Sequence, residues 1–191
     1  SGTFPALNGS NLTNLPAGNL SGTLPAISGA NLTGISAGIT VADNWRITSS
    51  VTGANSPLTS NWERVDTSGM GTIGSAMTQS SGVFTFPSTG VYQVSFTGYL
   101  ESTEQQRYHT LQIYATTNNS SYVHMSESSK YMNYTSATAY SGVHTHTFFD
   151  VTDTTQCKIR FHYVPAGSVT TLLGATTYNA SYVMFIRMGD T

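Results

Sequence analysis

From residue 90 onward, apolar and polar residues of this chain alternate in short runs. The alternation is clearest at 92–96, 111–115 and 159–163. Because successive side chains of a β-strand point to opposite faces, each run predicts a strand with one face buried and the other in water. The sequence shows no sustained apolar stripe of helical period, so an all-β fold with almost no helix is expected.

Turn-forming residues separate these runs, as in Pro87-Ser88-Thr89-Gly90 and Pro165-Ala166-Gly167. Residues 43–191 are long enough for a two-sheet sandwich or jelly roll of about seven to ten short strands. The last expected strand, 182–186, is apolar on both faces. This is expected where one face meets the core and the other meets another subunit. We therefore predict one jelly-roll β-sandwich domain over 43–191 that forms oligomers.

The first forty residues contain a repeat of twenty residues. Gly2-Thr3-Phe4-Pro5-Ala6-Leu7 aligns with Gly22-Thr23-Leu24-Pro25-Ala26-Ile27, and Asn11-Leu12-Thr13 aligns with Asn31-Leu32-Thr33. So thin a unit cannot bury its apolar side chains alone, and a homotrimer around an axis is the simplest solution. We expect residues 1–42 to form an extended repeat stalk, cut at a repeat boundary from a longer fibrous protein. The alternative is a disordered linker with incidental similarity.

Only 8% of the residues are charged, against roughly 25% in an ordinary soluble domain. The net charge of −2 leaves no basic stripe for nucleic acid or for an anionic membrane surface. No run is apolar and long enough to span a bilayer. We therefore expect neither nucleic acid nor a membrane among the partners. Cys157 is the only cysteine, and we expect it to be a strand thiol without chemistry.

Signatures of catalysis are missing from the sequence. Gly69, Gly71 and Gly74 have the spacing of a nucleotide-binding loop, but no amphipathic helix follows them. Glu101 and Glu104 could form an acid/base pair, yet they stand in a polar segment with nothing apolar to raise a pKa. We expect no enzymatic activity and no catalytic residues.

His144 and His146 are two residues apart in an expected strand, which places both imidazoles on one face together with Phe148. Two ligands are too few for a metal ion. If the strand ran near a three-fold axis, three copies would offer six nitrogens, an octahedral set suited to iron, nickel or a similar transition metal. Apart from this possible metal, we expect no cofactor. The alternative is two histidines on a solvent-facing or interface strand.

Tyrosines are interleaved with Ser, Asn and a few charges between residues 122 and 140. Tyrosine offers a large amphipathic face at low entropic cost, and Ser and Asn supply adaptable hydrogen bonds, as in antibody and sugar-binding sites. We therefore predict a receptor-binding patch here, with ordinary strand tyrosines packing at sheet edges as the alternative. Its residues are Tyr122, His124, Tyr131, Tyr134 and Tyr140.

One segment resembles a known family. Gly82, Phe84, Gly90, Tyr92 and Phe96 have the spacing of the central strand pair of the complement-type globular head, a jelly roll shared with tumour necrosis factor. The run 179–185 is similar to the closing strand of that family, and Val151-Thr152-Asp153 stands at its V-G-D turn, with Thr152 in place of the glycine. The resemblance implies a homotrimeric jelly roll that binds ligands and has no catalytic activity.

Repeats ahead of such a head resemble the fibres and appendages of tailed bacteriophages. This resemblance implies a non-enzymatic viral structural protein on the virion surface, the head of a phage tail fibre that binds a host-surface glycan or protein. The stalk would contact other virion proteins. A capsid decoration (cement) protein is the first alternative, and a secreted complement-like lectin is the second.

Overall fold

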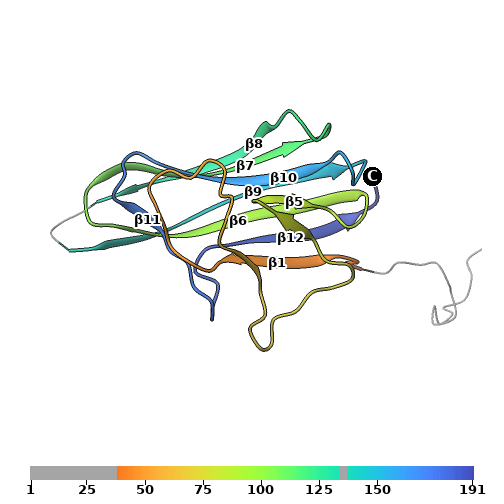
Figure 1. Ribbon diagram of the computed structural model, residues 1–191, viewed down its shortest axis with the longest axis horizontal. Coiled ribbons are helices and arrows are strands. Elements are labelled where there is room, and N and C mark those ends of the chain that lie inside the picture. The colour runs from red at the N-terminus through yellow and green to blue at the C-terminus, as the bar shows by residue number, and fades with distance from the viewer. Residues whose placement is uncertain (1–37, 134–136) are drawn as a thin grey trace, which may run out of the picture. The chain divides into compact units, whose positions relative to one another are not determined.

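A computed structural model describes residues 38–133 and 137–191 (Figure 1). These residues form strands and no helix, which confirms the all-β expectation. In this part of the chain no helix is long and apolar enough to cross a membrane. The expected stalk falls almost entirely on residues 1–37, outside the described residues. The strands are β1 (Ala42–Ile47), β2 (Val51–Thr52), β3 (Trp62–Arg64), β4 (Thr78–Ser80), β5 (Val83–Thr85), β6 (Gly90–Ser102), β7 (Gln106–Thr116), β8 (Val123–Met132), β9 (Ala139–Val151), β10 (Lys158–Pro165), β11 (Thr170–Leu172) and β12 (Tyr182–Gly189).

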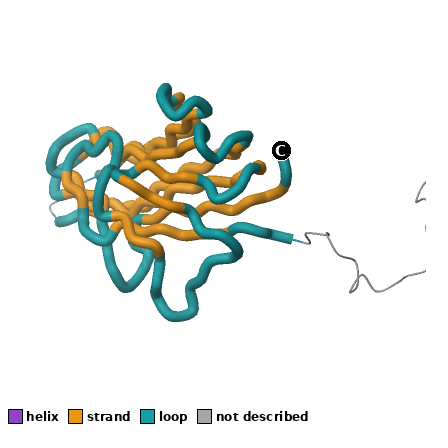
Figure 2. Tube along the Cα trace, turned by 45° about the vertical axis from the view of Figure 1, so that its right-hand side comes forward, coloured by secondary structure: helices purple, strands orange, loops and turns teal. Residues whose placement is uncertain are grey.

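The strands form two antiparallel sheets. In sheet A the order is β3-β1-β12-β6-β9, and the short strands β11 and β2 continue from the end of β6. In sheet B the order is β4-β5-β10-β7-β8. Figure 1 shows β7, β8 and β10 along one side of the sandwich and β6, β12 and β1 along the other. Figure 2 shows that the strands are joined by loops, without helices. Because the chain switches between the sheets after β3, β5, β6, β8, β9 and β10, this is a jelly roll.

Aromatic side chains from both sheets fill the interior. Phe84 and Phe161 of sheet B lie 5.3 Å and 6.0 Å from Phe185 of sheet A, centroid to centroid. Trp45 and Trp62 both pack edge-on against Phe84. The residues that the alternation predicted to face inward are all buried, which confirms the strand predictions. They are Tyr92, Val94, Phe96, Leu111, Ile113, Ala115, Ile159, Phe161 and Tyr163.

Three expectations need correction. The described residues contain twelve strands rather than seven to ten, because runs of two or three residues pair at the sheet edges. The segment 82–96 was expected to contain a strand pair, but β5 pairs with β10 and β6 pairs with β9 and β12. Buried Phe86 lies where the chain crosses between the sheets. Cys157 is buried and lies directly before β10 instead of in a strand.

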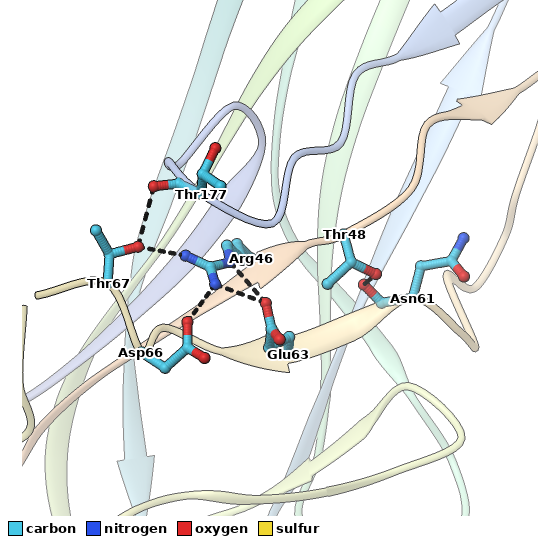
Figure 3. A network of polar contacts seen from close by, with 7 residues as sticks. All are labelled: Arg46, Thr48, Asn61, Glu63, Asp66, Thr67 and Thr177. Atoms are coloured by element: carbon cyan, nitrogen blue, oxygen red, sulfur yellow. Dashed lines mark hydrogen bonds and ion pairs between the residues drawn. The ribbon is translucent and has the colours of Figure 1, made fainter.

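A buried arginine is the centre of a network of hydrogen bonds and ion pairs on the outer side of sheet A (Figure 3). Arg46 on β1 is 1% exposed, and its Nε donates to Glu63 of β3 over 2.8 Å. Its other nitrogens donate to Asp66 and to the Thr67 hydroxyl, which in turn donates to the Thr177 carbonyl. Burial works against the charged form, but the two carboxylates outweigh it, so the pKa of Arg46 lies above its ordinary value. Through this network Arg46 joins three segments that are distant in sequence: β1, residues 63–67 and the loop that contains Thr177.

Candidate recognition surfaces

The outer face of sheet B is shaped by the connection between β7 and β8. The Asn118 side-chain oxygen accepts hydrogen bonds from the Thr116 hydroxyl and from two backbone N–H groups downstream. Asn119, with a positive φ of 52°, donates its N–H to the Gln156 carbonyl over 2.9 Å. Asparagine tolerates this left-handed conformation better than most residues. The connection therefore bends toward the start of β10 and carries Tyr122 onto the outer face of the sheet.

Arg160 of β10 lies between two tyrosines on this face. Its guanidinium carbon is 3.9 Å from the ring centroid of Tyr122 and 5.8 Å from that of Tyr114. Both distances are within the range of cation–π attraction. The Nε of Arg160 is buried without a hydrogen-bond partner, and no carboxylate of the described residues forms an ion pair with the guanidinium. The rings hold the charge in place but leave its donors free.

Tyr114 of β7 is the centre of a stack that crosses three strands. Its ring is 4.8 Å from His124 of β8 and 4.2 Å from His162 of β10, and both pairs are nearly parallel. His162 is 7% exposed and its Nε2 has no partner. Burial, with the charges of Arg160 and His124, lowers the pKa of His162 to about 4, so this imidazole is neutral at pH 7. We call Tyr114, Tyr122, His124, Arg160 and His162 the aromatic–arginine cluster.

A shallow hollow of about 290 Å³ adjoins this cluster on β8 and is lined by residues 124–127. Glu127 accepts a hydrogen bond from the Gln112 amide over 3.0 Å and lies 3.6 Å from His124 Nε2. The hollow thus offers a carboxylate and an imidazole, and the neighbouring cluster offers an arginine. This is a polar surface suited to binding, with several donors and acceptors within reach of one ligand.

The outer face of sheet A has a different character. Tyr99 of β6 and Tyr140 of β9 stack at 5.6 Å and are 39% and 55% exposed, and Phe148 of β9 is 59% exposed. The negative charge of Glu101 is the largest cause of the raised pKa of Tyr140, and burial, a hydrogen bond to Glu101 and the neighbouring Tyr99 act in the same direction. A second hollow of about 240 Å³ lies at the other edge of the same sheet. It is lined by Ala42, Asp43, Asn44, Met70, Gly71, Met184, Phe185 and Ile186.

His144 and His146 lie side by side on β9, as their spacing predicted. Their ring centroids are 5.7 Å apart, and His144 Nδ1 is 2.9 Å from the Thr97 hydroxyl. Such a hydrogen bond orients an imidazole so that its other nitrogen faces outward, as in many metal sites. Within a single chain, however, the described residues contain no group of three or more His, Cys, Asp or Glu side chains that could hold a metal ion. A metal here needs ligands from other copies.

The predicted receptor-binding residues do not form one surface. Tyr122 and His124 belong to the aromatic–arginine cluster, and Tyr131, 50% exposed, lies further along β8. Tyr140 lies on the other sheet, and Tyr134 lies outside the described residues. The tyrosine-rich segment is divided because the chain leaves sheet B after β8 and enters sheet A at β9.

Sequence reasoning missed Tyr114, Arg160 and His162. Their positions in the alternating runs already placed them on the outer side of β7 and β10. The available signal was their type, since tyrosine and arginine are enriched at recognition surfaces. What the sequence could not supply was the strand order, which brings β7, β8 and β10 together.

The described residues form a jelly roll of the tumour-necrosis-factor type. The crystal structure of murine APRIL at pH 5.0 matches it with a TM-score of 0.54 and 9% identity, over 78% of this chain and 98% of that chain. Eiger TNF from S. frugiperda matches with a TM-score of 0.53 and 14% identity, over 79% and 94%. No protein-family model and no curated protein sequence matches the chain. The comparisons therefore show the fold.

Proposed function

We propose that the chain is a non-enzymatic recognition head that assembles as a homotrimer. In this proposal the outer face of sheet A packs against other copies, and the outer face of sheet B binds the ligand. The observation that carries it is the apolar exposure on sheet A. Tyr99, Tyr140, Phe148 and Met188 lie on its strands and are each more than a third exposed. Exposed apolar side chains spread over one sheet face favour a protein–protein interface there.

The finer part of the proposal is a virion protein, the head of a phage fibre that binds a host-surface glycan or protein. Its support is the twenty-residue repeat of residues 1–40 together with the resemblance of such arrays to phage appendages. A capsid decoration protein and a secreted lectin are the alternatives. Immunogold labelling of particles that carry the chain separates them. We expect label at appendage tips, whereas label over the capsid shell supports decoration and unlabelled particles contradict a virion protein.

Assembly is tested by light scattering of the full chain. We expect a mass three times that of the 20.4 kDa chain. A monomer at all concentrations contradicts the proposed head. Binding is tested with labelled trimer on host cells. Simultaneous substitution of Tyr122 and Tyr131 by Ala should abolish binding and leave the trimer intact, and unchanged binding would place the site elsewhere.

A transition metal at the three-fold axis is a separate part of this proposal. Its support is the orientation of His144 by Thr97 and the position of His146 beside it on the same face. Metal analysis of protein purified without a histidine tag should give about one equivalent per trimer, as six imidazoles around one ion require. A His146→Ala variant should contain none. Wild-type protein with much less than one equivalent contradicts the metal site.

A further inference from the structure

The seven basic side chains are distributed unequally between the sheets. Each of the three on sheet A is neutralised, since Arg46 pairs with Glu63 and Asp66, Arg64 with Asp43, and Arg187 with Asp190. Among the described residues, none of the four on sheet B forms an ion pair, and the strands of that sheet carry a single carboxylate, Glu127. Unpaired cations therefore gather on one side of a chain whose net charge is −2. Those on sheet B are Arg107, Lys130, Lys158 and Arg160.

Arg160 differs from the other three. Lys158 already donates to the Thr154 carbonyl over 2.7 Å, and Arg107 and Lys130 are exposed side chains. Arg160 is half-buried and is held by the ring of Tyr122. Its Nε has no hydrogen-bond partner, and its guanidinium forms no ion pair within the described residues. A planar guanidinium fixed in this way is pre-organised to bind a carboxylate or sulfate through two parallel hydrogen bonds. The geometry thus supplies a charged donor without an acceptor.

The rest of the aromatic–arginine cluster suits the body of a sugar. Tyrosine rings stack on the apolar faces of saccharides and offer hydroxyls at their edges. His162 adds a buried imidazole whose Nε2 has no partner. Gln112 lies directly opposite His162 on β7, and Glu127 lies opposite Gln112 on β8. Neutral hydrogen-bond donors and acceptors next to aromatic rings can bind the hydroxyl groups of a sugar that stacks on those rings. Arg160, the one cation held in the cluster, matches one anionic group on the bound sugar.

We propose that the aromatic–arginine cluster binds an acidic saccharide, with the carboxylate or sulfate of the sugar on Arg160 and its ring against Tyr122. This inference rests on the proposed function of the outer face of sheet B and names its ligand class. A polyanion without rings would make only the charge contact. Nucleic acid would require more cations along its backbone than this face carries.

Isothermal titration of the full chain with four probes tests the proposal: oligogalacturonate, a sulfated dextran oligosaccharide, neutral dextran and polyglutamate. We expect binding of one or both anionic sugars and none of neutral dextran. Arg160→Gln should weaken binding roughly tenfold or more, because a bidentate charge-assisted contact is lost. Arg107→Gln is the matched control, since it removes the same charge from the same sheet and should change affinity less than about twofold. Arg160→Lys keeps the charge, loses the fork geometry and should bind less tightly than wild type.

Four outcomes would overturn the ligand assignment. They are equal affinity for neutral dextran, equal losses from Arg160→Gln and Arg107→Gln, equal affinity for polyglutamate, and binding of none of the sugars. In each case, trimer that still binds host cells leaves the proposed recognition head standing. Trimer that binds no cells contradicts the recognition head as well. Thermal unfolding of each variant, unchanged from wild type, establishes that a lost affinity reflects the site.

Discussion

Phe148→Ser is the most direct test of how the chain assembles. Phe148 extends from the outer face of β9 and is 59% exposed in the single chain. If this face is covered in the trimer, the exposed part of the ring is removed from water once per protomer. Serine at the same position removes the apolar surface and is compatible with an outward-facing strand position, so the fold itself should not change.

The magnitude follows from the exposed area. A phenylalanine side chain buries roughly 200 Å², so the exposed part of Phe148 is about 120 Å², worth about 3 kcal/mol per contact at 25 cal/mol per Å². Ordering of the interface consumes part of this, so an effective loss of about 1.5 kcal/mol per contact, or roughly tenfold, is a conservative expectation. A trimer contains three such contacts, so the tenfold losses multiply in the association constant of the trimer. Sedimentation velocity across a dilution series should show trimer for wild type and mostly monomer for Phe148→Ser at the same concentration.

Val123→Ser is the matched control for this prediction. Val123 is 63% exposed, about as much as Phe148, but lies on β8 at the edge of sheet B. It should leave the trimer unchanged. The reasoning fails if Phe148→Ser assembles like wild type, and it is reversed if Val123→Ser is the variant that dissociates, because assembly would then use sheet B.

Three further predictions test the fold. Removing both carboxylates with Glu63→Gln and Asp66→Asn leaves Arg46 buried without a charged partner, and urea unfolding should show a loss of about 3 kcal/mol, more than for Arg46→Met. Because the folded pKa of His162 is about 4, stability should be complete above about pH 6.5 and fall by up to about 3 kcal/mol as the pH drops toward 4, a slope that His162→Gln should flatten. Gly82→Ala should lower the thermal midpoint, at a cost of about 2 kcal/mol or more, because φ is +77° and the new Cβ overlaps a backbone carbonyl.

The fold class was predictable because a strand with one buried face shows alternating apolar and polar residues in its own sequence. Each strand of a half-buried sheet must alternate, and the runs at 92–96, 111–115 and 159–163 do so. Which strands pair with each other is not visible in this alternation. The sequence of β5 and β6 is the same whether they pair with each other or with distant strands, and so the jelly-roll crossing at Phe86 could not be derived from alternation.

The candidate site likewise has one part that was predictable from local sequence and one part that depends on strand order. Tyr122 and His124 were recognisable from a tyrosine-rich segment, because that signal is local. Arg160 belongs to a strand more than thirty residues later, and its role depends on the rings that β7 and the β7–β8 connection place around it. An arginine in an alternating strand is ordinarily a solvated residue. Only the strand order shows that this one is enclosed by tyrosines and lacks an acceptor.

Salt should affect the outer faces of sheet A and sheet B differently, because the chain has few charged residues. With 8% charged residues, the proposed interface on sheet A carries few charges. The arginines of its strands are already paired, and Glu101 and Asp150 are the only carboxylates on β6 and β9, so the stability of the interface should change little with salt. Ligand binding at Arg160 depends on an unpaired charge, which salt screens. The Debye length falls from about 10 Å at 0.1 M salt to about 3 Å at 1 M salt. We therefore expect the trimer to persist in 1 M sodium chloride while affinity for an acidic saccharide falls at least roughly tenfold. Dissociation of the trimer over the same range would show that charge holds the subunits together and that the two faces have been assigned the wrong way round.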